Sequence, residues 1–317
     1  MYTELHRNNE ILLVAPAGYE TAIQVDNLQK DYNATSNVYY QGGGHGGNLA
    51  YYLSNLGVRC ALYTHWGDDL PGIKARETML KAGVDISLCR TFEGETSQSN
   101  FLINIGSSKK TIMNFGTALG REDSEIKDIP IPKLFYTSLL PVKPALNLMK
   151  NANQIGAEVV VGFQIPTSVT ESLGLTHAII EQALACAAHV IGSYTVIAEE
   201  FNTNLKAAEL VRWLKCEFPH LKTVVITAGE NGSYAYANGE FFYQPAISIE
   251  EVDSTGAGDQ FIAGFLKDYL LDGIALEITL KRAAFYSAIV CSREGSRVLV
   301  TDDEIEKLLC SKEVLDR

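Results

Sequence analysis

Short apolar runs rich in β-branched residues recur along the chain and alternate with longer segments of helical period. The runs cover residues 11–15, 59–64, 158–162, 188–192 and 222–227. Parallel strands that are buried on both faces carry such continuous apolar runs, and helices between them form the crossovers. The pattern therefore predicts an α/β fold with a mostly parallel central sheet and flanking helices.

Two of the predicted helices have recognisable features. Pro71 stands at the start of one, which runs to Lys81, and Gly83 just beyond it suits a helix C-terminus. In the other, a single face collects the apolar residues Phe261, Phe265, Leu266, Tyr269 and Leu270. An apolar stripe of this kind faces a core, so both helices are expected to pack against the sheet or its neighbours.

Two polar stretches interrupt the alternation, at residues 16–42 and 92–117. They are rich in Thr, Ser, Asn, Gln and Tyr, and they show strand-like patterns such as SQSNFLINI, then Gly106, then KKTIMNF. We predict hairpins outside the main sheet, which come together as a small β lid over its open edge. No repeat and no linker interrupts the chain, so residues 1–317 are expected to form a single domain.

The charge balance limits the kinds of partner. The chain has 26 Lys and Arg against 38 Asp and Glu, a net charge of −12, which repels phosphate backbones and anionic lipids. We therefore expect no nucleic-acid partner and no membrane association. The six cysteines contain no CxxC pair and no ligand spacing with the six histidines, which indicates a reducing, cytoplasmic compartment and no zinc site. The N-terminal apolar stretch before Pro16 is too short for a signal segment or a membrane span.

A glycine-rich run, GGGHGGN at residues 42–48, leads into the helical sequence AYYLSNLG. Glycines let backbone approach a ligand closely, but they also make tight turns that cap helices. Gly42, Gly44 and Gly47 match the dinucleotide-binding pattern GxGxxG as well, with Asp68 about twenty residues further on. The polar VYYQ before the run argues against a dinucleotide site, because that motif usually follows a buried strand. The run alone leaves these three interpretations open.

A second motif, VDSTGAGDQF at residues 252–261, stands just before the helix with the apolar stripe. Small residues leave the backbone N–H groups bare at a helix N-terminus, where the amides and the helix dipole favour an anion such as a transferring phosphoryl group. Asp259 would lie beside that anion. As an ordinary helix cap it would repel such a ligand, whereas as a base it could accept the proton of an attacking hydroxyl.

At these residues the chain resembles the ribokinase-like (PfkB) family of carbohydrate kinases. Both of the family's recurrent motifs are present in the family's order, and Gly57, Gly67 and the sequence WGDDLPG resemble the continuation of the first. The resemblance covers nearly the whole chain. It implies a three-layer, ribokinase-like fold and transfer of the terminal phosphoryl group of ATP to a hydroxyl of a sugar or nucleoside. Mg²⁺ is implied as a cofactor, and dependence on K⁺ is an expectation at the level of the family.

The resemblance also implies roles for residues of the second motif and the nucleotide side. Asp259 resembles the catalytic base, and the backbone of Gly256, Ala257 and Gly258 resembles the anion hole. Asp253 resembles a carboxylate near the cation sites. The positions that resemble the nucleotide site are Thr227, Gly229, Gly232, Gly256 and Gly258.

On the acceptor side, Gly43, Gly44 and Asn48 match family positions that contact the acceptor's hydroxyls, which sets the dinucleotide interpretation aside. Glu20 falls where many members have a sugar-binding Asp. A Glu still accepts hydrogen bonds from hydroxyls, although its reach differs. A solvent-facing strand residue is the alternative for this position.

Two departures from the family pattern bear on the site. Where many members have Asn-x-x-Glu, a motif tied to magnesium and phosphate, this chain has SYTV at residues 193–196, and Glu199 or Glu200 is the available substitute. GFQIPTSV at residues 162–169 replaces a segment that is usually Asp or Asn followed by a polar, Arg-bearing stretch. Contacts from these two strand ends cannot be carried over from the family.

These departures motivate an alternative from another class, a catalytically idle family member that binds a ligand or a partner. The intact GAGD segment argues against it, because a binding module needs no general base. An unphosphorylated acceptor is expected, although Lys109, Lys110 and Arg121 near the predicted lid leave a phosphorylated one open. The exposed edge of the lid predicts a homodimer in which lids pair.

Overall fold

The core of the protein is a central sheet, seen in a computed structural model that describes residues 8–27, 29, 35, 37–104, 109–121 and 129–315. In the described part the sheet has eight strands in the order β14-β13-β12-β11-β10-β9-β1-β4. The parallel strands are β12 (Thr223–Thr227), β11 (His189–Ser193), β10 (Glu158–Phe163), β9 (Leu134–Thr137), β1 (Ile11–Val14) and β4 (Cys60–Tyr63). The antiparallel ones are β13 (Ser233–Ala237) and β14 (Glu240–Gln244).

All five apolar runs of the sequence form strands of this sheet, which confirms the predicted mostly parallel α/β fold. Strand β1 shows why such runs are continuous. Its residues Ile11 and Leu13 join the core on one face of the sheet, while Leu12 and Val14 join the core on the other. All four side chains are fully buried, so an apolar residue is favoured at every position.

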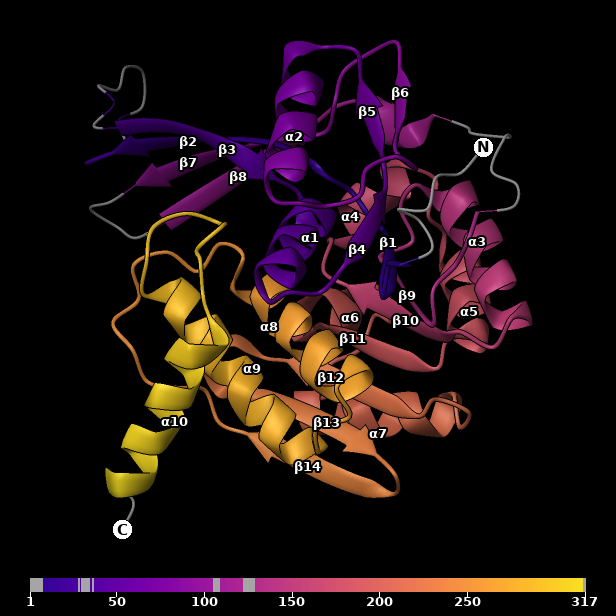
Figure 1. Cartoon of the computed structure of the whole chain (residues 1–317), viewed down its shortest axis with the longest axis vertical. Helices are drawn as coiled ribbons and strands as arrows, with labels where there is room; N and C mark the ends of the chain where they lie inside the picture. The colour runs from indigo at the N-terminus through magenta and orange to yellow at the C-terminus, as the bar shows by residue number, and fades with distance from the viewer. Residues whose placement is uncertain are drawn as a thin grey trace.

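Helices cover both faces and complete three layers (Figure 1). One layer contains α1 (His45–Asn55), α2 (Leu70–Lys81), α8 (Ala257–Phe265), α9 (Leu276–Cys291) and α10 (Asp302–Leu315). The other contains α3 (Val142–Gln154), α5 (His177–Cys186), α6 (Tyr194–Glu200) and α7 (Ala207–Glu217), with the short α4 (Thr167–Ser172) against α6. The helix expected up to Lys81 is confirmed as α2. Its N-terminus is capped by Asp69, whose side chain accepts a hydrogen bond of 2.9 Å from the amide of Gly72.

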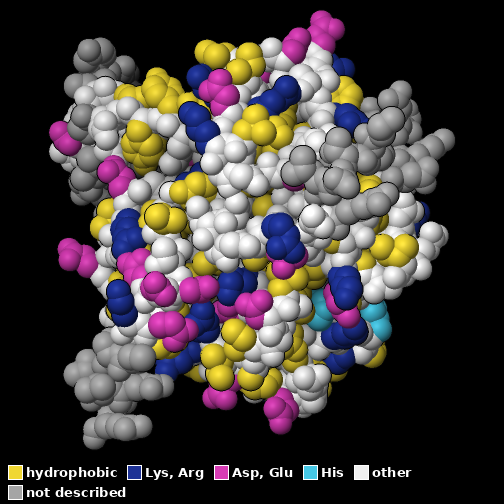
Figure 2. Space-filling view, in the orientation of Figure 1, with side chains coloured by type: hydrophobic (Ala, Val, Ile, Leu, Met, Phe, Trp, Pro, Cys, Tyr) yellow, Lys and Arg dark blue, Asp and Glu magenta, His cyan; other side chains and the backbone are white. Residues whose placement is uncertain are grey.

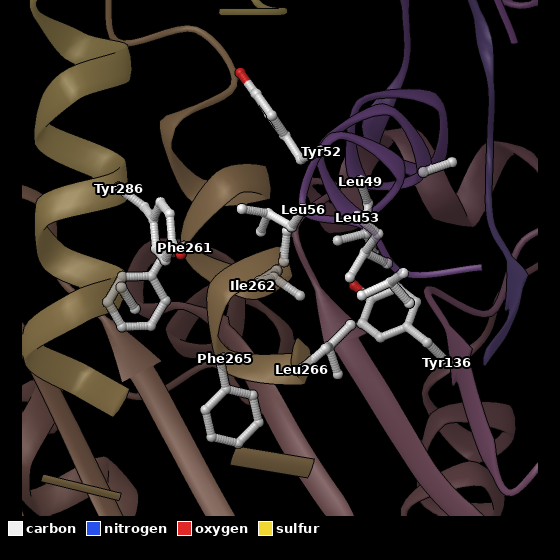
Figure 3. Packing of buried hydrophobic residues seen from close by; sticks show 14 of the residues in the cluster. Leu49, Tyr52, Leu53, Leu56, Tyr136, Phe261, Ile262, Phe265, Leu266 and Tyr286 are labelled. Atoms are coloured by element: carbon white, nitrogen blue, oxygen red, sulfur yellow. The ribbon is translucent and has the colours of Figure 1, made fainter. Parts of the chain in front are cut away.

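Helix α1 packs against α8, and this contact joins segments about two hundred residues apart in sequence. Leu49 and Leu53 of α1 lie beside Ile262 and Leu266 in a buried apolar cluster that includes Tyr136 of β9 (Figure 3). The predicted apolar stripe is thereby confirmed, although its last residues lie in a π-helical turn that follows α8 at Leu266–Leu271. The packing brings the N-terminal ends of α1 and α8 together at the carboxyl edge of the sheet.

The two polar stretches form a separate small sheet, as predicted. Its strand order is β3-β2-β7-β8, with bounds β2 (Gly18–Val25), β3 (Asn37–Gly43), β7 (Gln98–Asn104) and β8 (Lys109–Phe115). Each hairpin is antiparallel, and the parallel pairing of β2 with β7 joins them. The sheet projects from the main body in Figure 1. A two-stranded ladder of β5 (His65–Gly67) and β6 (Arg90–Phe92) lies outside both sheets.

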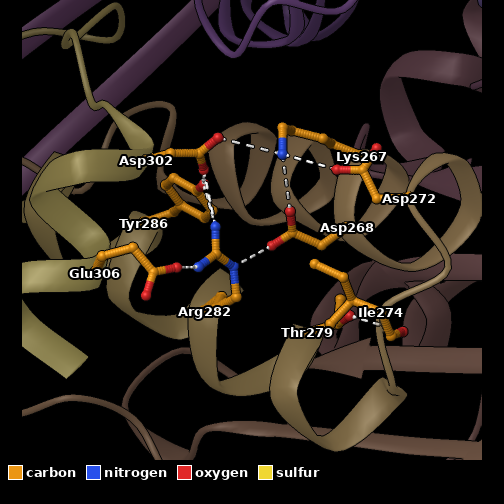
Figure 4. Close-up of polar contacts among 9 residues, drawn as sticks. All are labelled: Lys267, Asp268, Asp272, Ile274, Thr279, Arg282, Tyr286, Asp302 and Glu306. Atoms are coloured by element: carbon orange, nitrogen blue, oxygen red, sulfur yellow. Dashed lines mark hydrogen bonds and ion pairs between the residues drawn. The ribbon is translucent and has the colours of Figure 1, made fainter. Parts of the chain in front are cut away.

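A buried network of charges ties the C-terminal helix to this core (Figure 4). Asp268, which is fully buried, accepts hydrogen bonds from Arg282 Nε at 2.6 Å and Lys267 Nζ at 3.3 Å. Arg282 Nη2 also donates to Asp302 of α10 at 2.8 Å. Each buried charge has a partner of opposite sign, because an unpaired one would be strongly destabilising.

The surface of the described chain mixes both signs of charge. On the face shown in Figure 2, acidic and basic side chains are interspersed among apolar ones. None of the described helices has the length and hydropathy needed to cross a bilayer.

Candidate active site

The two glycine-rich motifs become the N-terminal ends of α1 and α8. Gly44 precedes α1 with φ of 75°, and Gly256 precedes α8 with φ of 81°, a left-handed conformation that favours glycine. A Cβ atom at Gly256 would also lie 2.5 Å from the carbonyl oxygen of Ser296. Glycine is thus required at the second motif both by its conformation and by a close backbone approach.

Asp259 lies in the first turn of α8 and reaches across to α1. Its Oδ1 is 2.6 Å from Nδ1 of His45, and its Oδ2 accepts a hydrogen bond of 2.9 Å from Nδ2 of Asn48. The Asp259 side chain is 13% exposed, so it is largely enclosed yet reachable by a ligand. Each carboxylate oxygen keeps a lone pair for a further donor.

The amides that begin α8 form a place for an anion. Gly258 and Asp259 occupy its first turn, where backbone N–H groups have no intrahelical acceptor. Among the described residues, no side chain caps this helix end. The carboxylate and these amides therefore stand together, as expected for a base beside a phosphoryl site.

Gln164, at the end of β10, reaches this helix end. A Cβ on Gly258 would lie 3.1 Å from its Oε1, and its Nε2 is a buried donor with no hydrogen-bond partner in the described structure. An unmatched buried donor is rare in proteins. The sequence pointed to this segment only as a departure from the family, and the structure shows that Gln164 lies next to the amides that begin α8.

A cavity of about 690 Å³ opens beside these amides. Four of the predicted nucleotide-binding residues line it, namely Thr227, Gly229, Gly232 and Gly258. Phe261, Ile247 and Ile249 add an apolar lining, which suits a flat aromatic base. Gly256 does not line this cavity; it shapes the turn that presents the amides.

A second hollow, of about 680 Å³, lies at the opposite edge of the sheet. It is lined by residues at or before the first residues of strands, including Glu158, His189 and Lys222. Volume does not distinguish the two hollows. Position does, because ligands of open α/β sheets bind at the carboxyl ends of the strands, where the first cavity lies.

The predicted acceptor residues also come together. Glu20 is 3% exposed, so the solvent-facing alternative for this residue is wrong. Its Oε1 accepts a hydrogen bond of 3.1 Å from the Gly44 amide, and its Oε2 accepts from Gln41 Nε2 at 3.1 Å and Ser296 Oγ at 2.7 Å. Burial raises the pKa of the Glu20 carboxyl, while the Ser296 and Gly44 hydrogen bonds oppose that rise. Glu20 thus braces the glycine turn from β2.

Arg297 is a member of this site that sequence reasoning missed. Its Nε donates to Asn48 Oδ1 at 3.1 Å, its Nη1 to Thr78 Oγ1 at 3.1 Å and its Nη2 to the Gly43 carbonyl at 3.4 Å. Burial lowers the pKa of the guanidinium to about 10, so it stays charged at neutral pH. Nothing in the local sequence marks it, because it follows α9 and reaches the glycine run only through tertiary packing.

The predicted metal-site residue Asp253 binds the backbone in this structure. Its Oδ1 accepts hydrogen bonds from the amide and hydroxyl of Thr255, and its Oδ2 accepts from the amide of Gly295 at 3.2 Å. Ser193 lines the cavity beside α8, whereas Glu199 and Glu200 do not. Glu200 lies instead 2.9 Å from Nδ1 of His177. Within the described residues no group of three His, Cys, Asp or Glu side chains is placed to hold a metal.

Comparison with known sequences agrees with this geometry. A model of the pfkB family of carbohydrate kinases matches residues 12–303. An ATP-dependent ribose-1-phosphate kinase of Halopiger xanaduensis is 25% identical over 312 residues, which cover 95% of this chain and 98% of that protein.

Solved structures share the fold over almost its whole length. Ribokinase of Arabidopsis thaliana, complexed with ribose and ATP, superposes with a TM-score of 0.77 at 19% identity and covers 95% of this chain and 98% of its own. A nucleoside kinase of Methanocaldococcus jannaschii superposes with a TM-score of 0.78 at 18% identity, with the same coverage. The predicted three-layer, ribokinase-like fold is therefore confirmed.

Proposed function

The chain belongs to the pfkB family of carbohydrate kinases, and from that premise we propose that it transfers the terminal phosphoryl group of ATP to a hydroxyl of a sugar or nucleoside, with Asp259 as the general base. The observation that carries this proposal is the position of Asp259. Its carboxylate is held by His45 and Asn48 beside the bare amides of the α8 N-terminus. A base next to an anion site is what in-line attack on phosphorus needs.

In this proposal the chain acts mainly by positioning its two substrates. ATP would occupy the cavity lined by Thr227, Gly229 and Gly232, with its terminal phosphate toward the amides of Gly258 and Asp259. The acceptor hydroxyl would approach Asp259 from the side of the glycine run and give up its proton to the carboxylate as its oxygen attacks. Holding both partners in line supplies much of the catalysis, because association entropy has been lost before the reaction.

We propose that Mg²⁺ binds together with ATP and is held mainly by its phosphates. Mg²⁺ commonly binds through one or two carboxylates, several waters and substrate phosphates, so a site without a protein cage suits it. When bound with ATP, the ion neutralises charge on the phosphates. Asp253, the residue proposed to lie near the cations, already accepts hydrogen bonds from Thr255 and Gly295, and it could reach an ion only through the remaining lone pairs of its oxygens. Dependence on K⁺ belongs to the same proposal.

The acceptor is proposed to be an unphosphorylated sugar or nucleoside. Glu20, Asn48 and backbone at Gly43 and Gly44 offer hydrogen-bonding groups of the kind that hydroxyls match. The relative from Halopiger is named for a phosphorylated sugar, ribose 1-phosphate, so sugar phosphates must be tested as well. Lys109 and Lys110 lie in β8 of the small sheet.

The proposal also covers the domain organisation, the oligomeric state and the cellular compartment of the protein. We propose one domain over residues 1–317, in which the small sheet, from about 16–42 and 92–117, acts as a lid over the acceptor and pairs with the lid of a second copy. The five cysteines whose side chains the structure describes are free thiols, which is compatible with a cytoplasmic protein. Limited proteolysis with and without acceptor, together with sedimentation, would test the lid and the dimer.

The decisive experiment is an ADP-release assay with ATP, Mg²⁺ and K⁺ across pentoses, hexoses, sugar acids, sugar phosphates and nucleosides. Acceptor-dependent ADP release is expected for at least one class. Asp259→Asn should lower kcat by about 10²- to 10⁴-fold, since it removes the base but keeps the volume of the side chain. ATP binding, measured by calorimetry, should persist in the variant.

The alternative from another class is the idle family member that only binds a ligand or a partner. The kinase names of the relatives described above give it no support. This alternative would be favoured if the protein bound ATP but released no ADP with any acceptor in the panel. Near-normal turnover of Asp259→Asn would instead remove the base assignment while leaving the kinase in place.

A further inference from the structure

His45 links the proposed base to a buried tyrosine. Its Nδ1 is 2.6 Å from Oδ1 of Asp259, and its Nε2 is 2.6 Å from the hydroxyl oxygen of Tyr136. The imidazole is 6% exposed and Tyr136 is fully buried. The three side chains come from α1, α8 and β9, so only the folded chain assembles this row.

The chemistry of the two outer groups decides which nitrogen of neutral His45 carries the proton. The Asp259 carboxylate can only accept, so Nδ1 must donate to it. Burial raises the pKa of Tyr136 well above its usual value, and the nearby Asp259 charge adds to that rise, so Tyr136 keeps its proton and can donate to Nε2. The two hydrogen bonds are therefore donated in the same direction: Tyr136 donates to His45, and His45 donates to Asp259.

The row is also held rigidly at its far end. Tyr136 lies so close to β10 that a Cβ atom on Gly162 would be 1.8 Å from its hydroxyl oxygen. His45 is the first residue of α1, where Gly44 fixes the entry of the chain. With Tyr136 fixed by β10 and His45 fixed by α1, the imidazole has little freedom to turn away from Asp259.

We propose that His45 is a positioning residue that holds the carboxylate of Asp259 in line for the acceptor hydroxyl by donating from Nδ1, with the Tyr136 hydroxyl satisfying Nε2 at the other side of the ring. This inference rests on the proposed role of Asp259. His45 need not touch either substrate. It occupies one lone pair of Oδ1 as Asn48 occupies one of Oδ2, so two donors set the plane of the carboxylate and each oxygen keeps a lone pair for the acceptor.

Two substitutions at His45 separate positioning from packing. His45→Asn keeps an N–H donor at the place of Nδ1, and it should retain kcat within about 10-fold of the wild type. His45→Leu fills similar space without a donor, and it should lower kcat by roughly 100-fold, the size of loss that a misplaced catalytic group produces. KM for ATP should change little in either variant. Equal losses in both variants would overturn the proposal.

His65 offers a matched control. Its Nε2 lies 2.8 Å from the hydroxyl of Tyr63, so it forms another buried Tyr–His pair, placed on β5 away from Asp259. His65→Leu should lower the thermal midpoint as His45→Leu does, because both lose a buried hydrogen bond. It should leave kcat per folded molecule unchanged. A similar loss of kcat in His65→Leu would show that general destabilisation explains the effect.

Nitrogen NMR of the six histidine side chains tests the row without any turnover. His45 is assigned by its loss in His45→Asn, and in the wild type above the ionisation of imidazole it should show the proton on Nδ1. Tyr136→Phe should leave the proton on Nδ1, because the Asp259 carboxylate still requires a donor there. A wild-type Nε2–H tautomer would overturn the inference even if the kinase is active. If no acceptor reacts with the wild type, the proposed function fails, while the spectra still decide whether this row exists.

Discussion

The guanidinium of Arg297 donates from Nε to the side-chain oxygen of Asn48 at 3.1 Å, and this contact turns the Asn48 amide toward the base. With Oδ1 taken by Arg297, Nδ2 points to Asp259 Oδ2 at 2.9 Å. An amide can be flipped with little change in shape, so its orientation depends on what its oxygen accepts. Arg297 thereby determines which atom of the Asn48 amide faces Asp259.

Arg297→Lys is predicted to impair acceptor use while leaving ATP binding intact. The substitution keeps the charge but loses the fork of donors that reaches Asn48, Thr78 and Gly43 together. Loss of one charge-assisted hydrogen bond is worth about 1.5–3 kcal/mol, so kcat/KM for the acceptor should fall by roughly 10- to 150-fold. Steady-state kinetics with each substrate varied in turn would measure this effect.

Arg293 provides the control for Arg297. It lies four positions earlier in the same segment and donates to the Leu299 carbonyl at 2.9 Å, on the exposed side. Arg293→Lys should leave both kinetic constants near those of the wild type. If Arg297→Lys behaves in the same way, its contacts to the glycine run do not matter for the acceptor.

Gln164→Leu is predicted to lower turnover without lowering the stability of the folded protein. The Nε2 donor of Gln164 is buried and has no hydrogen-bond partner among the described residues, and Oε1 of the same side-chain amide lies next to Gly258 at the start of α8. We expect it to donate to the transferred phosphoryl group, so its removal should lower kcat by roughly 10²-fold. The ligand-free protein should be as stable as the wild type or more stable, since an unsatisfied buried donor disappears. Turnover and urea unfolding of the same sample would measure both effects.

Gln260 serves as the matched residue for that experiment. Its Nε2 is also buried and without a partner among the described residues, but it does not line the nucleotide cavity. Gln260→Leu should reproduce the effect on stability without the loss of turnover. A full loss of stability in Gln164→Leu would show that the amide supports the fold instead.

Glu20 is predicted to make the stability of the protein depend on pH. Its carboxyl has a pKa raised above 4.5 in the folded protein, chiefly by burial, so the folded state binds its proton more tightly than the unfolded state. Its contribution is most favourable below pH 4.5 and is lost as the pH rises through the raised pKa. Glu20→Gln lacks this ionisation. The difference in unfolding free energy between wild type and variant, from urea titrations, should therefore move against the wild type between pH 4.5 and neutral pH. A constant difference would mean that Glu20 stays ionised in the folded state.

The strands that sequence reasoning identified are those whose burial on both faces leaves an unbroken apolar run, such as residues 11–15 and 222–227. It did not identify β9, although all four of its residues are buried. It also did not identify β13, in which buried and half-buried positions alternate, or β14, in which every position is half-buried or exposed. Strand β13 gains its order from pairing with β12, and the edge strand β14 gains its order from pairing with β13, which no local pattern records.

The residues of the candidate site likewise divide into those that local sequence rules could identify and those that only tertiary contacts bring to it. The glycines and Asp259 could be found because local rules require them: a left-handed turn at Gly256 and bare amides at a helix N-terminus. His45 was visible within the first motif, but it carried no signal of its partners. Arg297, Tyr136 and Gln164 were missed as site residues, since each acts through contacts made by a different element.

By itself, the sequence determined the α/β class, the two motifs that begin helices and the candidate base. Periodicity and glycine conformation act over a few residues, so they can be recognised in the linear chain. Only the tertiary structure decided that α1 packs on α8, which brings His45 to 2.6 Å from Asp259 across 214 positions. It likewise decided that the segment after α9 returns to place Arg297 on Asn48. Such contacts depend on how buried faces fit together, and the separation of two residues along the chain does not record that fit.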